Sequence, residues 1–189
     1  LWIDSDADIT IRDSGKDGTV QNSVEFAHTI FNLGTLTLES GCFKAMYSAI
    51  NSYGTLKING GTFEASEYAV YICEGYVEIN NGIFKGTVWS FTDYTINGGT
   101  FDAHFGINKE SGVLTVNDGT FNDNKIMIMR GTVNLKGGEF TNGIILNDVN
   151  NDEDDPQYLN ELLADGCFYR DANGNLIEVA DDATAIDGY

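Results

Sequence analysis

The sequence predicts an all-β protein, a parallel β-solenoid of about 20 residues per coil with a small C-terminal α+β cap. Three observations lead to this fold class: a repeated segment, an alternation of apolar and polar residues inside each copy, and a glycine-rich turn after each alternating run. The composition agrees, because 22 glycines and one proline among 189 residues favour tight turns over rigid breaks.

The repeat is the main signal in this chain. Most copies open on glycine and all end on phenylalanine, and they span residues 34–43, 54–63, 75–84, 94–101, 112–121 and 131–140. The six phenylalanines follow one another at spacings of 20, 21, 17, 20 and 19 residues, so each copy predicts one coil. Residues 7–15 form an earlier, degenerate copy.

Each copy predicts three short strands. In the first strand apolar residues alternate with polar ones, which is the period of a strand with one buried face. The expected inward pairs are Ile9/Ile11, Leu36/Leu38, Leu56/Ile58, Val77/Ile79, Tyr94/Ile96, Leu114/Val116 and Val133/Leu135. A glycine-rich turn, a second strand carrying the phenylalanine and a third apolar strand follow. One copy cannot bury its own apolar face, so the coils stack in parallel at about 4.8 Å.

Stacking predicts columns of equivalent residues. The six phenylalanines form an internal aromatic column, and Asn59, Asn80, Asn97 and Asn117 form an amide ladder at the first corner. The residue after each phenylalanine alternates in charge from Lys44 to Glu64 to Lys85, which favours pairing between coils.

Charge and hydropathy exclude several partners. The chain carries 10 Lys+Arg and 29 Asp+Glu, a net charge of -19, which repels nucleic acid and anionic membrane surfaces. The apolar runs are too short for membrane insertion, which needs about 20 residues. The cysteines Cys42, Cys73 and Cys167 have no metal-ligand spacing, and they allow at most one disulfide.

A composition shift predicts two parts, coils in 1–149 and an acidic C-terminal cap in 150–189. Residues 150–189 hold 11 acids and one base. Asp155 is a good N-cap before Pro156, so a short helix is expected over 156–164. Residues 167–170 and 176–179 flank a turn and predict a β-hairpin.

The repeat, read as Gly-x-(Leu/Val)-x-(Ile/Leu/Val)-Asn-Gly-Gly-Thr-Phe, resembles the right-handed parallel β-helix repeats of large bacterial cell-surface proteins, in the pectate-lyase-like class. The resemblance covers residues 7–147. It implies a single-stranded right-handed β-helix and an extracellular or cell-surface location. The class includes polysaccharide lyases, glycoside hydrolases, adhesins and phage tailspikes, so function has to come from a site.

The first functional hypothesis is a non-catalytic extracellular module of a larger surface protein. It displays a face that binds carbohydrate or a host-surface protein, or it acts as a spacer. A polysaccharide lyase or glycoside hydrolase is the second hypothesis, although no cluster of carboxylates with a base stands out and Asp93, Asp102 and Asp118 are explained by turns and columns. A phage tailspike or fibre segment is the third.

The third strands supply the candidate binding residues. If the residues flanking them point inward, Tyr71, Met127 and Met129 point outward, with Tyr47 and Tyr68 nearby. Exposed aromatic and methionine side chains predict a groove for sugars or a protein interface. A one-residue slip of register would reverse the faces, and this alternative stays open.

Calcium is the one ion that the sequence suggests. Asp4, Asp6 and Asp8 alternate oxygen ligands, and Asp148, Asp152 and Asp154 belong to a second oxygen-rich cluster. The first segment is not an EF-hand, since Ile9 and Gly15 occupy the positions that need glycine and glutamate. The alternative is a solvated acidic loop with helix-capping aspartates.

Overall fold

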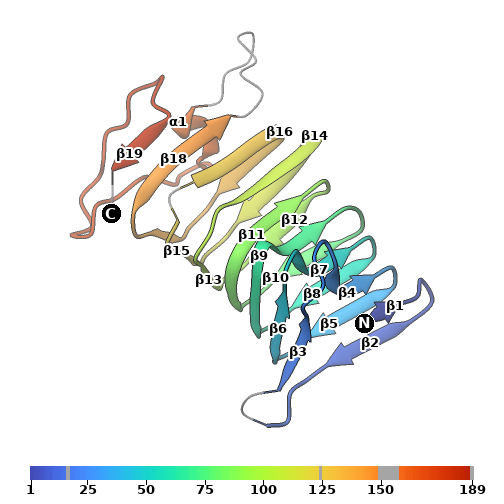
Figure 1. Cartoon of the computed structure of the whole chain (residues 1–189). Helices are drawn as coiled ribbons and strands as arrows, with labels where there is room; N and C mark the ends of the chain where they lie inside the picture. Colours follow the sequence, from blue (N-terminus) through green and yellow to red (C-terminus); the bar gives the residue numbers. More distant parts are fainter. Residues whose placement is uncertain (16–17, 124, 149–157, 188–189) are drawn as a thin grey trace.

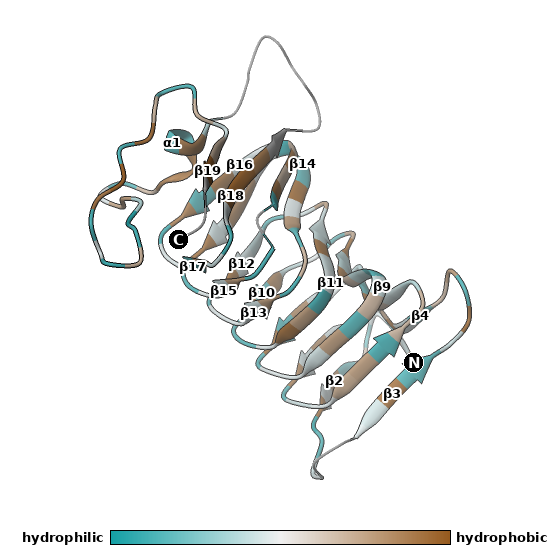
Figure 2. Cartoon of the chain, turned by 60° about the vertical axis from the view of Figure 1, so that its left-hand side comes forward, coloured by the Kyte–Doolittle hydropathy of each residue, from teal (hydrophilic) through white to brown (hydrophobic). Residues whose placement is uncertain are grey.

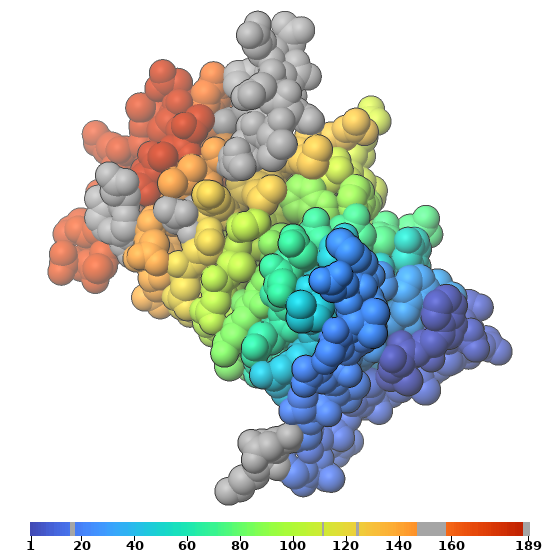
Figure 3. Space-filling model, in the orientation of Figure 1, coloured from blue at the N-terminus to red at the C-terminus, as the bar shows by residue number. Residues whose placement is uncertain are grey.

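The computed structural model describes residues 1–15, 18–123, 125–148 and 158–187. It is an all-β parallel solenoid of about 6 turns with roughly 20 residues per coil, and its coils follow one another in sequence order along one axis (Figures 1 and 3). The predicted fold class is therefore confirmed, while the right-handed sense stays a prediction. No helix among the described residues has the length and apolar character needed to cross a membrane.

Each coil adds one rung to each of three parallel sheets, as the three predicted strands per copy require. The first sheet contains β2 (Asp8–Ile11), β5 (Thr35–Leu38), β8 (Thr55–Ile58), β10 (Val77–Ile79), β12 (Tyr94–Ile96) and the final residues of β14 (Phe105–Val116) and β16 (Lys125–Leu135). The second contains β3 (Thr19–Asn22), β6 (Cys42–Ala45), the beginnings of β9 (Thr62–Ile72) and β11 (Ile83–Ser90), and β13 (Thr100–Phe101), β15 (Thr120–Phe121) and β17 (Glu139–Phe140).

The third sheet carries the residues of most interest for function. It contains β1 (Trp2–Ile3), β4 (His28–Asn32), β7 (Ser48–Ser52), the ends of β9 and β11, the beginnings of β14 and β16, and β18 (Gly143–Asp148). The chain passes from the second to the third sheet without a break in β9 and β11, and from the third to the first in β14 and β16.

The core lies between the three sheets. Six of the seven expected inward pairs of the first sheet are buried, from Leu36 and Leu38 through to Val133 and Leu135. Ile9 and Ile11 are in register with the buried Leu36 and Leu38 and so point inward as expected, but Ile9 is 38% exposed and Ile11 only half-buried. Both belong to the first coil, and in the described residues β2 pairs with β5 alone. Their inward faces therefore meet solvent at the open end of the solenoid.

The phenylalanine column is confirmed. Consecutive rings from Phe43 to Phe140 have centroids 4.7 to 5.3 Å apart and interplanar angles of 8 to 17°. All six rings except that of Phe140 are buried. These parallel stacks fill the second side of the core with one ring per coil.

The amide ladder is also confirmed. Asn80 donates from Nδ2 to Oδ1 of Asn59 at 2.8 Å, Asn97 to Asn80 at 2.7 Å, and Asn117 to Asn97 at 2.6 Å. Each amide therefore bridges two coils at the first corner. The charge column after the phenylalanines pairs Lys44 with Glu64 at 3.1 Å.

The C-terminal segment differs from its prediction. The helix α1 spans Leu159–Leu162 instead of 156–164, with the Tyr158 amide donating to Glu161 at 3.0 Å. The expected N-cap Asp155 and Pro156 lie outside the described residues. The helix ends early because Leu163 is extended and forms a parallel bridge with Leu135 of the last coil.

The expected hairpin is reduced to a single antiparallel bridge between Arg170 and Leu176. The turn between them forms, since Asp171 accepts hydrogen bonds from the amides of Asn173 and Asn175. The segment instead adds β19 (Ala185–Asp187) antiparallel to β18. Hydrophobic residues are prominent on β16 and β18, beside this segment (Figure 2). A separate capping domain over 150–189 stays a prediction.

Candidate functional site

The alternation of the third sheet places the predicted residues on its outer face. Val70 and Ile72 are fully buried while Tyr71 between them is half-buried, and Ile126 and Ile128 are buried on either side of the half-buried Met127. The register therefore has the orientation in which Tyr71 and Met127 point outward, and no slip reverses the faces. Met129 is half-buried as well.

Strand pairing aligns these outward residues into one column. The register joins Trp2 to Phe31, Asn51, Tyr71, Trp89, Gly106 and Met127, one residue on each rung of the third sheet before β18. Four of the seven are aromatic. Neighbouring rungs lie about 4.8 Å apart, so the column is a continuous line along the solenoid axis.

Further rings flank the column and join it into an aromatic strip, defined by Trp2, Phe26, His28, Phe31, Tyr47, Tyr68, Tyr71, Trp89 and Phe91. Ring centroids are 4.5 Å apart for Trp2 and Phe31, 6.0 Å for Phe31 and His28, and 5.7 Å for His28 and Tyr47. The line continues at 5.6 Å to Tyr68, 4.7 Å to Tyr71, 5.6 Å to Phe91 and 6.3 Å to Trp89. Phe26 adds an 81% exposed ring 6.1 Å from Tyr47.

Gly106 determines how the strip ends. A Cβ atom at this position would lie 2.8 Å from Cζ3 of Trp89 and 2.1 Å from the carbonyl oxygen of Met127. Because Gly106 has no side chain, the Trp89 indole packs against the backbone of the next rung, and Trp89 is accordingly only 7% exposed. Met127 and Met129 lie beyond this covered rung, so the structure groups the three tyrosines and leaves the two methionines at the far end.

The tyrosines of the strip combine apolar rings with available polar groups. The hydroxyls of Tyr47, Tyr68 and Tyr71 have no hydrogen-bond partner within the described part of the chain. Burial raises the pKa of Tyr68 and of Tyr71, so both hydroxyls stay protonated at neutral pH. Each can donate one hydrogen bond and accept others from a ligand that lies on the rings.

A polar network lies under one edge of the strip. The Cys73 thiol donates to Oδ1 of Asn51 at 3.4 Å, and Nδ2 of Asn51 contacts Nε2 of His28 at 2.9 Å. Burial lowers the pKa of His28 and raises the pKa of Cys73. Because the amide stands between thiol and imidazole, the histidine does not activate the sulfur, and the network is structural.

The candidate calcium ligands are placed separately. Asp4, Asp6 and Asp8 are exposed, and Oδ1 of Asp4 accepts a hydrogen bond from the Trp2 indole at 2.8 Å. Over residues 1–15, 18–123, 125–148 and 158–187, no three His, Cys, Asp or Glu side chains are grouped to hold a metal ion. Asp148 ends β18, while Asp152 and Asp154 lie outside the described residues.

Sequence reasoning found Tyr47, Tyr68 and Tyr71 but missed most of the strip. Trp2, Phe31 and Trp89 share a column with Tyr71 only through the pairing register, and Phe26 and Phe91 lie in the bends that flank the strands. Aligning the third strands by their buried residues would have placed the first three in one column. Comparison with protein-family models, with curated proteins and with solved structures finds no match to this chain.

Proposed function

We propose that this chain is a non-catalytic binding module that holds an extended, uncharged glycan on the aromatic strip. The observation that carries the proposal is the uninterrupted line of rings from Trp2 through Tyr71 to Phe91, with three tyrosine hydroxyls unpaired in the described residues. The apolar faces of sugar rings stack on aromatic rings, and sugar hydroxyls exchange hydrogen bonds with tyrosine.

The shape of the strip favours a polymer over a single sugar. Its rings follow one another along the solenoid axis on successive rungs, so a chain of sugars can contact several of them at once. The net charge of -19 disfavours an acidic polysaccharide, because like charges repel at the approach of ligand and protein. A neutral glycan carries no such penalty.

The proposal is for a non-catalytic module because the candidate acids Asp93, Asp102 and Asp118 are engaged in structural contacts. Asp93 accepts a hydrogen bond from the Val113 amide at 2.8 Å and pairs with Lys109 at 3.0 Å. Asp102 accepts from Asn122 at 2.7 Å, and Asp118 from the Gly119 amide at 2.8 Å. These contacts tie the acids to turns and to neighbouring coils.

The cellular setting is part of the same proposal. The likeness of the repeat to those of bacterial surface proteins supports an extracellular or cell-surface location, where a rigid solenoid can present its long face to a glycan. A host-surface protein is the alternative partner for the same strip, and the experiment below separates the two.

The test is a glycan array followed by calorimetric titration of the best neutral oligosaccharide. Tyr71→Ala should weaken binding by about tenfold or more, as truncation of a central aromatic contact does. Tyr76→Ala is the matched control, since Tyr76 is 61% exposed and makes no ring contact within the described residues. Unchanged affinity in EDTA is expected if the strip alone binds.

Failure of the wild-type protein to bind any glycan on the array would overturn the glycan proposal. Equal losses of affinity in Tyr71→Ala and Tyr76→Ala would also overturn it. Capture of a defined host protein that Tyr71→Ala abolishes would replace the glycan by a protein partner.

A further inference from the structure

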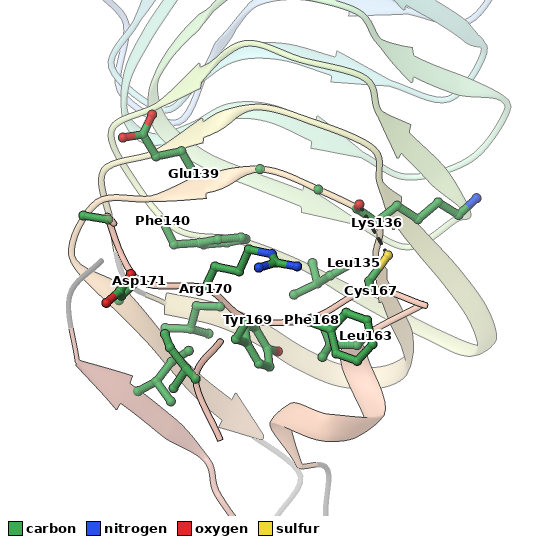
Figure 4. Close-up of a pocket in the computed structure, with 17 residues that line it drawn as sticks. Leu135, Lys136, Glu139, Phe140, Leu163, Cys167, Phe168, Tyr169, Arg170 and Asp171 are labelled. Atoms are coloured by element: carbon green, nitrogen blue, oxygen red, sulfur yellow. Dashed lines mark hydrogen bonds between the residues drawn. The ribbon is translucent and has the colours of Figure 1, made fainter. Parts of the chain in front are cut away.

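A cavity lies at the other end of the molecule from the first coil, between the last coil and the C-terminal segment (Figure 4). Its volume of about 380 Å³ is within the range of small-molecule sites. The last coil contributes Leu135, Phe140 and Ile144, and the C-terminal segment contributes Leu163, Tyr169 and Arg170. The walls are therefore mainly apolar, and the charged residues on them are Lys136, Glu139, Arg170 and Asp171.

Phe140 gives this cavity a flat aromatic wall. Its ring stacks on Phe121 with centroids 4.7 Å apart and an angle of 14°, and this is its one ring contact in the described residues. The five earlier phenylalanines are buried, whereas Phe140 is half-buried. Figure 4 shows its other face turned toward the C-terminal segment. A planar ring placed there would continue the stacking of the column.

Arg170 supplies a positive charge at the same wall. Its side chain extends beneath Phe140 (Figure 4), and Nη1 donates to the carbonyl oxygen of Gly174 at 2.9 Å. The side chain is exposed, and within the described residues it forms no ion pair. The guanidinium is therefore available to an external anion that lies against the Phe140 wall.

Tyr169 holds the opposite side of the cavity in place. Its hydroxyl donates to the carbonyl oxygen of Leu159 at 2.9 Å, which ties the segment that carries Arg170 to helix α1. Leu163 after the helix forms a bridge with Leu135 of the last coil, so the backbones that carry Arg170 and Phe140 are joined and the site is largely preformed.

We propose that this cavity binds a small planar aromatic anion, with its ring stacked on Phe140 and its acidic group paired with the Arg170 guanidinium. A neutral ring would not use the guanidinium charge, and a small inorganic anion would not use the Phe140 face. The class is therefore an aromatic carboxylate or a similar acid of one or two rings, which the cavity volume accommodates.

The test is calorimetric titration of the full chain with three probes: 2-naphthoate, its neutral amide 2-naphthamide, and cyclohexanecarboxylate. We expect 2-naphthoate to bind tightest, by about tenfold over each of the others, because it alone uses both the ring and the charge. Arg170→Gln should reduce 2-naphthoate binding about tenfold and leave 2-naphthamide unchanged.

Two controls locate the site. Lys57→Gln removes a cation that is paired with Glu78 in the middle of the solenoid, and it should leave 2-naphthoate binding unchanged. Tyr71→Ala should also leave it unchanged, so binding of the probe to the aromatic strip is recognised separately. Circular dichroism of each variant verifies that the solenoid is intact.

Failure of 2-naphthoate to bind at millimolar concentration would overturn the proposal. Equal affinity of wild type and a folded Arg170→Gln would do the same, and so would a 2-naphthoate signal that Tyr71→Ala abolishes. Because the cavity and the aromatic strip lie on different parts of the fold, none of these results would overturn the glycan proposal.

Discussion

Replacement of Phe84 by alanine tests whether the phenylalanine column is the main stabilising feature of the coils. Phe84 is fully buried, and its ring stacks on Phe63 at 5.1 Å and on Phe101 at 4.7 Å. A buried Phe→Ala change costs about 3–5 kcal/mol, and each aromatic pair adds about 0.5–1.5 kcal/mol beyond its burial. With two pairs lost, Phe84→Ala should fall at the upper end of that range.

Two further variants separate stacking from burial. Phe84→Leu keeps most of the apolar volume and loses both stacks, so it should cost about 1–3 kcal/mol. Phe140→Ala removes a half-buried ring with one stacking partner, and should cost roughly half as much as Phe84→Ala.

Urea unfolding followed by circular dichroism measures these differences, and amide hydrogen exchange locates them. Because each coil contacts only its neighbours, Phe84→Ala should accelerate exchange in β9, β11 and β13 first. A cost for Phe140→Ala equal to that of Phe84→Ala would refute the reasoning, and a neutral Phe84→Leu would show that stacking contributes nothing beyond burial.

Two other predictions concern hydrogen bonds and pH. In the wild-type protein Nδ2 of Asn97 donates to Asn80 and, at 3.2 Å, to Glu78. Asn97→Asp removes this donor and places a carboxylate beside Glu78, so it should lower the free energy of unfolding by about 2 kcal/mol at pH 7. The folded state raises the pKa of the introduced carboxyl, so urea unfolding should show part of this loss recovered at pH 4, and an unchanged midpoint at pH 7 would contradict the ladder. Burial lowers the pKa of His28, and its Nδ1 has no hydrogen-bond partner in the described residues. As the pH falls, this histidine is therefore protonated at a higher pH in the unfolded chain than in the folded chain. Thermal unfolding should then show wild-type stability falling as the pH drops below 6.5 more steeply than in His28→Gln, whereas parallel curves would assign the fall to other groups.

The sequence reasoning succeeded where one coil repeats the next. The phenylalanine and asparagine columns depend only on the spacing of equivalent residues, so the stacking of Phe63 on Phe84 and the bond from Asn97 to Asn80 follow once the repeat is aligned. Their geometry is the same in every interior coil. At the two ends of the solenoid the repeat does not predict burial. Val20 is in register with the buried Phe43 yet is 41% exposed, because the repeat does not indicate what covers an outermost strand.

The candidate sites were harder to predict because they lie where the repeat is irregular. The pairing of β14 with β16 shifts register between Ile107 and Val113, and the pairing of β9 with β11 shifts between Lys85 and Val88, where the chain passes from the second to the third sheet. The cavity depends on the bridge between Leu163 and Leu135, a contact between distant segments that no local pattern encodes. The capping pattern at Asp155 and Pro156 predicted a helix that continues to residue 164, whereas Leu163 is extended and bridges Leu135.

Contrast between two outer faces of the same coils is the strongest argument that the aromatic strip serves binding. The outward residues of the first sheet are polar or charged, and Lys57 pairs with Glu78 at 3.4 Å on adjacent rungs. The third sheet has the same parallel rungs and an equally buried inner face, yet its outward column carries Phe31, Tyr71 and the 61% exposed Trp2. Coil stacking does not require rings there, since the first sheet stacks without them. Exposed aromatic surface also favours aggregation. Rings retained on one face alone therefore indicate a ligand for that face, which is what Tyr71→Ala is designed to test.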